Sequence, residues 1–287
     1  MNKTISKDKV YLVTGGSGFL GQELIARILK LGGRVKTIAR DEGKLIQLKQ
    51  RYPEVEILTG DIADPFDMHQ ALKGVDAVFH LAAFKHVGIA EDQPRECVKS
   101  NLIGSLNLLE LSANLDLDFV VMISTDKTAI VSGVYGASKF LMERLTHQFE
   151  KNYPNNVYRV VRYGNVLYST GSVLCKWKDL LEQDKEVIIT NPEATRFYWT
   201  VDQAVDLIFD CLENATDSQP NVPEMKSMRM GDLLTAMANK YLPEGGTLKV
   251  KEIGMQPGEN LHEKVLADGI PSNEAEKFTI EEIQEMI

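Results

Sequence analysis

The stretch Val10-Tyr11-Leu12-Val13-Thr14-Gly15-Gly16-Ser17-Gly18-Phe19-Leu20-Gly21 decides the fold class of this 287-residue chain. Its first four residues are apolar and predict a short buried strand. A glycine-rich turn follows, and residues 22–31 then show a helical pattern. A strand, a glycine-rich turn and a helix in this order are typical of a dinucleotide-binding unit; the alternative is a glycine-rich turn without a ligand.

The glycines of this turn have separate expected roles. Gly15 permits the tight turn, Gly18 lets the backbone approach a pyrophosphate, and Gly21 lets the helix pack closely on the strand. The N-terminus of the helix would then bind the phosphates. The expected cofactor contacts in this segment are Gly15, Ser17, Gly18, Phe19, Leu20 and Gly21.

The residues after the second expected strand, at 34–39, bear on the choice of cofactor. An acidic side chain here would bind the ribose hydroxyls of NAD, and an arginine would accept the 2′-phosphate of NADP. Both are present, as Arg40 and Asp41. Because Arg40 directly follows the strand, we expect NADP rather than NAD. The alternative is a charged turn in solvent.

Strands and helices continue to alternate over the first part of the chain. Further strands are expected at residues 55–62, 77–83, 119–123 and 157–163, and helices at 42–51, 65–72, 97–114 and 135–150. This alternation predicts an α/β fold with a Rossmann-type doubly wound parallel sheet, which would form an NADP-binding domain over residues 1–170. Residues 171–287 are expected to form a smaller C-terminal substrate-binding lobe, interleaved with the first domain.

Several residues near the third and fourth expected strands are candidates for a functional role. Asp61, followed by Ile62, is expected to bond the adenine amine, or else to cap the helix that follows. Ala82 is small enough for a cofactor to lie close to the backbone. His80 lies among apolar residues and is interpreted as packed rather than catalytic. Asn101 either supports the site from behind or is exposed.

The overall composition excludes several classes of protein. A net charge of −9 argues against a broad basic surface for nucleic acid. No apolar run reaches the ~18–20 residues needed to cross a membrane, and residues 1–9 are polar, without a signal-peptide core. Cys97, Cys175 and Cys211 form no metal-binding pattern and are expected to be reduced thiols. We therefore expect a cytoplasmic protein without a metal site.

The candidate catalytic groups follow the fifth expected strand. Thr125-Asp126-Lys127 comes directly after that strand, and Tyr135 and Lys139 lie on the helix that comes next. Because Tyr135 and Lys139 are four residues apart, they share one helical face. A tyrosine that removes a hydroxyl proton needs its pKa of ~10 lowered, and the charge of Lys139 would do this.

These motifs together resemble the extended short-chain dehydrogenase/reductase superfamily. The resemblance extends over nearly the whole chain and narrows to the bacterial polysaccharide-biosynthesis branch, which includes the UDP-N-acetylglucosamine 4,6-dehydratases of the C5-inverting PseB type. The motifs that carry it include the glycine turn, His80-Leu81-Ala82-Ala83, Ser124-Thr125-Asp126-Lys127, Tyr135-x-x-x-Lys139, Thr195-Arg196-Phe197 and Pro257-Gly258-Glu259-Asn260-Leu261-His262-Glu263.

The resemblance implies a reaction in three steps. The C4 hydroxyl is oxidised by the bound NADP, water is eliminated across C5 and C6, and the hydride returns to C6, as in the biosynthesis of pseudaminic acid or related surface glycans. Thr125 would bond the 4-hydroxyl, Asp126 would be the acid and Lys127 the base. The expected contacts to the UDP-N-acetylhexosamine substrate are Lys85, Asn165, Arg196 and Glu259. A homo-oligomer built through the helices at 97–114 and 135–150 is also implied.

Two departures from the family pattern leave alternatives open. Residues 128–133 lack the proline and asparagine of the family loop, and Gln256 replaces an arginine. The alternative reaction is epimerisation, or a later step on a 4-keto or 5,6-ene UDP-sugar. A non-catalytic NADP sensor is a third interpretation, which the intact Tyr135 and Lys139 pair disfavours.

Overall fold

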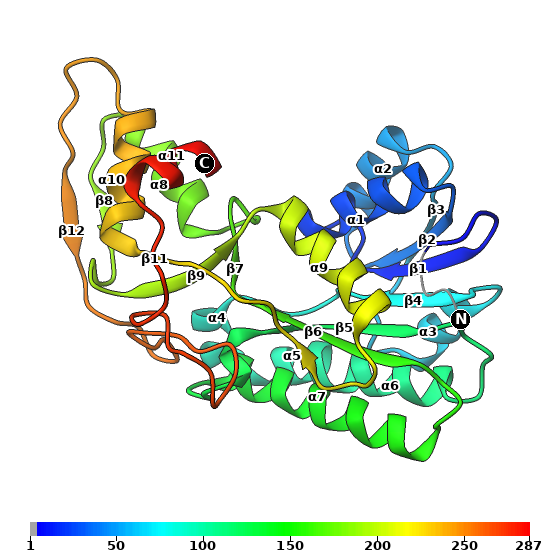
Figure 1. Ribbon diagram of the computed structural model, residues 1–287. Coiled ribbons are helices and arrows are strands. Elements are labelled where there is room, and N and C mark those ends of the chain that lie inside the picture. The colour runs from blue at the N-terminus through cyan, green and yellow to red at the C-terminus, as the bar shows by residue number, and fades with distance from the viewer. Residues whose placement is uncertain (1–4) are drawn as a thin grey trace.

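The computed structural model describes residues 5–287, so the first four residues of the polar N-terminal stretch lie outside it. Within this range the main sheet has seven parallel strands in the order β10-β6-β5-β4-β1-β2-β3 (Figure 1). Their bounds are β1 (Val10–Thr14), β2 (Arg34–Ala39), β3 (Glu56–Thr59), β4 (Ala77–His80), β5 (Val120–Thr125), β6 (Tyr158–Tyr163) and β10 (Pro220–Asn221). The sequence-based prediction of an α/β fold with a parallel Rossmann-type sheet is confirmed.

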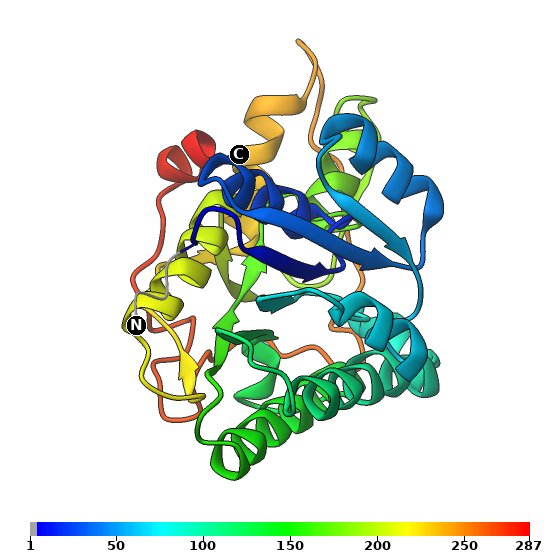
Figure 2. The same cartoon turned by 90° about the vertical axis from the view of Figure 1, so that its right-hand side faces the viewer.

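Helices cover both faces of the main sheet, and Figure 2 shows the sheet between the blue helix α1 and the long green helix α7. Alternate residues of β1 supply the two cores: Tyr11 and Val13 pack with α1 and α9, and Leu12 packs with α3, α6 and α7. The bounds are α1 (Phe19–Lys30), α2 (Glu42–Arg51), α3 (Pro65–Leu72), α6 (Gly104–Ser112), α7 (Val134–Asn152) and α9 (Val201–Asn214). Each face of the sheet therefore has its own buried apolar layer.

A further apolar cluster, the second apolar cluster beside the cores of the main sheet, forms from the later part of the chain, on the upper left of Figure 1. Trp177 is its largest side chain and is fully buried. Two small sheets and three helices surround it: β11 (Ser227–Arg229), β9 (Thr195–Trp199) and β7 (Asn165–Val166); β12 (Val250–Glu252) and β8 (Val187–Ile189); and α8 (Val173–Leu181), α10 (Met230–Tyr241) and α11 (Ile280–Met286). However, α9 and β10 come from beyond residue 170 and still pack on the main sheet.

Two elements differ from the sequence-based expectation. The helix expected at residues 97–114 is in three parts: α5 (Pro94–Val98), a π-helical turn (Lys99–Ile103) and α6. The segment 217–230, expected as a loop, contains β10 and β11. Both differences have the same cause, because neither a local π-helical turn nor a strand of two or three residues has a periodicity that the sequence pattern can reveal.

Candidate active site

A cavity of about 1290 Å³ lies between the main sheet and the second apolar cluster. It begins at the carboxyl ends of β1 and β4, where the strand order reverses. This reversal is the position at which doubly wound sheets bind their ligands. Except for Asp126, every residue that the sequence nominated for cofactor, catalysis or substrate lines this cavity.

The glycine turn fits closely against the end of β4. Gly15 has a φ of +69°, and a side chain there would place Cβ 2.9 Å from the backbone of Ala82. A Cβ on Gly21 would lie 2.6 Å from the carbonyl oxygen of Gly15. At Gly16, whose role was not predicted from the sequence, a Cβ would lie 2.4 Å from the Thr37 hydroxyl oxygen, which accepts from the Gly16 N–H at 3.1 Å. The turn can therefore form only with glycines at these positions.

The beginning of α1 leaves its first turn accessible to a ligand. Gly18 is its N-cap and supplies no side-chain hydrogen bond to the helix. Ser17, Phe19 and Leu20 line the cavity beside it. The backbone N–H groups of this turn together with the helix dipole suit a pyrophosphate.

His80 supports the turn from beneath and is only 1% exposed. Its Nδ1 lies 2.9 Å from Thr14 Oγ1, and its Nε2 lies 3.0 Å from Ser105 Oγ. Because Thr14 Oγ1 already accepts from the N–H groups of Leu81 and Ala82, it donates to Nδ1. Burial lowers the pKa of His80 to about 3, so the ring is neutral. The structure agrees with a packed rather than a catalytic histidine.

The end of the cavity beside β2 and α2 carries more positive than negative charge. Arg40 and Lys44 line it, together with Arg51. The Asp41 carboxylate is already used, because it caps α2 by accepting from the Lys44 N–H at 3.0 Å. That bond lowers the pKa of Asp41. Arg40 is exposed and has room to meet a phosphate.

Asp61 also lies at this end of the cavity, but it does not cap α3. The cap is Asp64, which accepts from the Phe66 N–H at 2.8 Å. Asp61 instead accepts from the Ala63 N–H and from Lys99 Nζ, at 3.0 and 2.8 Å. Burial opposes ionisation of Asp61, but Lys99 and the N–H outweigh it and lower its pKa. Asp61 therefore faces the cavity as a carboxylate.

A continuous polar network forms the cavity wall at the end of β5. The Thr125 hydroxyl donates to Asp126 Oδ1 at 2.9 Å, and Lys127 Nζ bonds the same oxygen at 2.9 Å. Thr125 and Lys127 line the cavity, whereas Asp126 lies behind them and is fully buried. The second oxygen of Asp126, Oδ2, has no hydrogen-bond partner among residues 5–287.

Lys127 lies between two carboxylates, and this differs from what a neutral base requires. Its Nζ is 2.9 Å from Asp126 Oδ1 and 3.5 Å from Glu263 Oε1. Burial would lower the pKa of Lys127, but the two carboxylates outweigh burial and raise it. Lys127 is therefore an ammonium in this structure, whereas the sequence-based argument expected desolvation to dominate.

Tyr135 and Lys139 both lie on the first turns of α7 and line the cavity. Burial raises the pKa of Tyr135, and the hydrogen bond with Thr125 and the charge of Lys127 oppose this only in part. The cation that opposes the rise in the Tyr135 pKa is Lys127. Lys139 Nζ contacts Met142 Sδ at 3.0 Å.

Lys139 supplies the observation that best fits a bound dinucleotide. It is only 2% exposed, and burial lowers its pKa to about 8. Among residues 5–287, no oxygen accepts a hydrogen bond from its ammonium group. Since a buried amine with unused donors is costly, hydroxyl groups of a cofactor ribose would complete this site.

Glu143 lies one turn after Lys139 on α7, and its carboxylate bonds side chains at the end of β5 and on β6. It forms a two-bond ion pair with Arg162 of β6, at 3.1 and 2.5 Å. Its Oε1 also accepts from Thr128 at 3.2 Å and from Ser124. This buried pair joins β5, β6 and α7 behind the Asp126 and Lys127 segment.

The expected substrate residues lie on the far wall of the cavity. Lys85 Nζ donates to the Thr170 carbonyl at 2.8 Å, and Asn165 Nδ2 to the Phe197 carbonyl at 3.4 Å. Arg196 NH1 donates to the carbonyls of Thr195 and Leu261, so part of its guanidinium is already engaged. Glu259 lies at the cavity rim. Glu263 was not predicted from the sequence as a site residue, although it is the last residue of the motif at 257–263.

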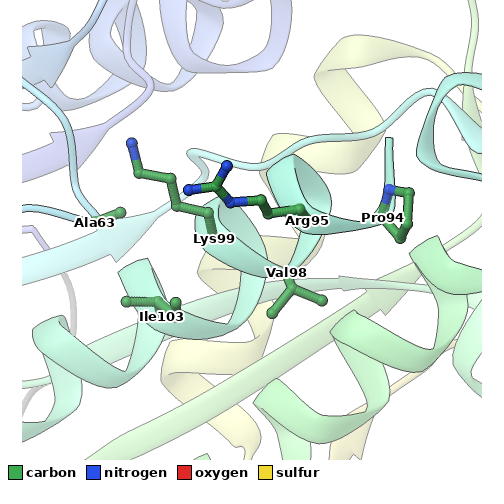
Figure 3. A pocket seen from close by; sticks show the side chains of 6 residues that line it. All are labelled: Ala63, Pro94, Arg95, Val98, Lys99 and Ile103. Carbon is green, nitrogen blue, oxygen red and sulfur yellow. The ribbon is translucent and has the colours of Figure 1, made fainter. Parts of the chain in front are cut away.

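A separate groove lies on the outer side of α5 and the π-helical turn (Figure 3). Its walls are Ala63, Pro94, Arg95, Val98, Lys99 and Ile103. Val98 and Ile103 are 37% and 44% exposed.

Residues 5–287 contain no group of histidine, cysteine and acidic side chains arranged for a metal ion. None of the helices in the described part of the chain has the length and apolar character to cross a bilayer.

Comparisons with known proteins agree with this architecture. A family described as polysaccharide biosynthesis protein matches residues 11–284. An uncharacterized membrane protein of Methanocaldococcus jannaschii is 34% identical, covering 98% of this chain and 85% of that protein. The UDP-glucose 4-epimerase of Rickettsia akari is 30% identical, with coverage of 91% and 78%.

Among solved structures, Pen from Bacillus thuringiensis superposes with a TM-score of 0.93 and 25% identity, covering 99% of this chain and 98% of that one. Together with the sheet order and the glycine turn, these matches place the molecule among known proteins. The chain belongs to the polysaccharide biosynthesis protein family and has the fold of the epimerases and dehydratases of the short-chain dehydrogenase/reductase superfamily.

Proposed function

We propose that this enzyme is an NADP-dependent UDP-N-acetylglucosamine 4,6-dehydratase of the C5-inverting kind. The product would be a UDP-4-keto-6-deoxy-N-acetylhexosamine. The observation that carries the proposal is the hydrogen-bonded Asp126 and Lys127 pair beside Thr125 and Tyr135. A reaction that only transfers a hydride needs the tyrosine as its acid and base. Elimination of water needs a further acid and a further base.

The first step is removal of the C4 hydroxyl proton by Tyr135. Thr125 bonds Tyr135 and would also orient the 4-hydroxyl of the sugar. The positive charge of Lys127 favours the phenolate form, and Lys139 would hold the cofactor ribose. The nicotinamide of NADP, when bound, supplies the acceptor for the C4 hydride. The resulting ketone makes the proton on C5 acidic.

The second step uses the Asp126 and Lys127 pair. Transfer of one proton along their 2.9 Å hydrogen bond converts the ion pair into a neutral amine and a protonated carboxyl group. These are the base and the acid that elimination requires. A water-excluding substrate favours this neutral form, because burial penalises charges. Lys127 then takes the C5 proton, and Asp126 protonates the leaving C6 hydroxyl through the Thr125 hydroxyl, so that water leaves and a 4-keto-5,6-ene remains. Return of the hydride to C6 and of a proton to C5 would then give the 4-keto-6-deoxy product.

The choice of NADP rests on Arg40 and Lys44. Both lie on the cavity wall beyond β2, and Asp41, which would otherwise bind ribose hydroxyls, is occupied as the cap of α2. A 2′-phosphate would meet two cations there. Asp61 would contact the adenine amine, with Ile62 and Ala82 along the nucleotide.

The UDP-sugar would lie along the wall formed by Lys85, Asn165, Arg196 and Glu259. Arg196 keeps guanidinium donors that its backbone bonds do not use, and these suit a diphosphate. Lys85 comes just before α4 (Val87–Asp92), and its Nζ donates to the Thr170 carbonyl at 2.8 Å.

We also propose that the protein is a homo-oligomer, joined through α5, α6 and α7. Large apolar residues between 37% and 47% exposed occur on α5 and the π-helical turn, as Val98 and Ile103, and on α7, as Phe140 and Leu141. An exposed apolar surface of this kind is typical of an interface. Light scattering on the purified protein would give the mass: a dimer or higher form supports the proposal, and a monomer contradicts it.

A second candidate is a 4-epimerase, and one observation favours it. Lys127 is an ammonium in this structure, and epimerisation requires no neutral lysine. The epimerase name of the Rickettsia relative points in the same direction.

Proton NMR of the reaction in D₂O separates the two. The enzyme is incubated with NADP and UDP-N-acetylglucosamine. A new 6-methyl signal with deuterium at C5 supports the dehydratase, and an inverted C5 configuration supports the inverting type. Formation of UDP-N-acetylgalactosamine, or an unchanged substrate, contradicts the proposal.

A further inference from the structure

Glu263 is a buried carboxylate whose backbone is fixed against β9. It is 1% exposed and does not form part of the cavity wall. Its N–H donates to Ser272 Oγ, and the Ser272 N–H donates back to its carbonyl, both at 2.8 Å. Ser272 Oγ lies within hydrogen-bond distance of Thr195 on β9. The position of the Glu263 main chain is therefore set by the fold and not by a ligand.

The carboxylate of Glu263 is shared between two cations. Its Oε1 lies 3.5 Å from Lys127 Nζ and 3.9 Å from Arg196 Nε, and its Oε2 accepts from Asn260 at 3.3 Å. Lys127 comes from the end of β5 and Arg196 from β9. A buried carboxylate is stable only when it is paired in this way, so Glu263 depends on both cations.

The surroundings of Lys127 show why one more carboxylate matters. The charged and titratable groups that face it are Asp126 on its own segment, Glu263 on the C-terminal segment, Tyr135 on α7, and Arg196 and Tyr198 on β9. Asp126 is the closest of these, and Arg196 opposes the charge of Lys127. Without Glu263, one carboxylate would face two cations.

We propose that Glu263 is a positioning residue that holds the Lys127 ammonium at the cavity wall and keeps free amine scarce in the resting enzyme. This refines the proposed function, on which it rests for its consequence: Glu263 sets how readily Lys127 passes its proton to Asp126. The ionisation of Lys127 itself can be measured whichever reaction the enzyme catalyses.

Competitive amine labelling with acetic anhydride, read by mass spectrometry, tests this on the full-length enzyme. Labelling of Lys127 is measured from pH 7 to 10 and divided by that of the exposed Lys30 in the same sample. The variants are Glu263→Gln, Glu263→Asp and, as the matched control, Glu274→Gln. Glu274 is an exposed carboxylate on the same C-terminal segment.

In Glu263→Gln, we expect Lys127 labelling at pH 8 to rise about tenfold, because loss of one facing carboxylate lowers its pKa by about one unit. Glu263→Asp should restore part of the protection, and Glu274→Gln should match the parent enzyme. An unchanged curve in Glu263→Gln would overturn the proposal. So would an equal rise in Glu263→Asp, because the shorter acid keeps a carboxylate at this position.

The kinetic readout separates this inference from the proposed function. If the enzyme is a dehydratase, Glu263→Gln should change kcat for C5 deuterium incorporation at least fivefold while KM stays within twofold. A labelling shift in an enzyme that performs no elimination would sink the dehydratase and leave the role of Glu263 standing. Normal elimination with unchanged labelling would support the dehydratase and overturn the role of Glu263.

Discussion

The side-chain amide of Asn101 donates to the hydroxyl oxygen of Ser138 at 3.0 Å, and Ser138 donates onward to the carbonyl of Tyr135 at 2.8 Å. Asn101 lies in the π-helical turn and is fully buried. It also bonds both the N–H and the carbonyl of Phe84, at 2.7 and 2.9 Å. One side chain thus joins the loop after β4 to the helix that carries Tyr135.

Replacing Asn101 by Ala should destabilise the protein by about 2–4 kcal/mol, because two partly buried backbone groups of Phe84 would lose their partners. Urea unfolding measures the change. Asn107→Ala is the control: that side chain makes one bond, to the Ile62 carbonyl at 3.2 Å, and its removal should cost about 1 kcal/mol. Equal losses in the two variants would contradict the role given to Asn101.

His80 should make the fold sensitive to acid. Its pKa is about 3 in the folded protein, against an ordinary value near 6.5. Between these pH values the unfolded chain binds a proton that the folded chain does not, so stability falls as the pH falls. Between pH 7.5 and 5 the parent protein should lose about 2 kcal/mol more than His80→Asn. The exposed His69 provides the control: a His69→Asn variant that also loses the sensitivity would refute the assignment.

The Glu143 and Arg162 pair should be much more important for stability than an exposed pair. Replacing Glu143 by Gln leaves the buried Arg162 charge without its counter-ion and should cost about 3–5 kcal/mol. Glu182→Gln, which breaks the exposed pair with Lys178, should cost below about 1 kcal/mol. Thermal unfolding of both variants provides the comparison, and similar midpoints would be inconsistent with a buried pair.

Arg40 should determine the preference for NADP. In Arg40→Ala, we expect NADP binding to weaken about tenfold and NAD binding to change by less than twofold, because only NADP carries the 2′-phosphate. Fluorescence titration with the two reduced cofactors measures both constants. Arg34→Ala, an exposed arginine at the beginning of β2, is the control. An equal loss of affinity for both cofactors would show that Arg40 does not bind the 2′-phosphate.

The sequence predicts the parts of this molecule that have a local signature. The glycine turn requires glycine because Ala82 lies within 2.9 Å of where a Cβ would be, and the apolar strands alternate with helices at recognisable periods. The common helical face of Tyr135 and Lys139 follows from their spacing, and both residues line the cavity.

The remaining features depend on contacts between distant segments. Glu263 approaches Lys127 across 136 residues of chain, which no spacing rule can reveal. The same contact helps to raise the pKa of Lys127. This residue is therefore an ammonium and not the neutral base that was expected from the sequence. Asp61 could be identified as a strand-end acid, but its partner Lys99 is supplied by the π-helical turn. Tertiary placement therefore decides the protonation states on which the chemistry depends.

The most direct test of the central claim follows the C4 hydrogen. UDP-N-acetylglucosamine deuterated at C4 is incubated with the enzyme and NADP in ordinary water, and the product is examined by deuterium NMR. A 4,6-dehydratase moves the hydride within one molecule, so the account predicts deuterium in the new C6 methyl group. Deuterium that remains at C4, whether in the substrate or in its C4 epimer, would contradict it.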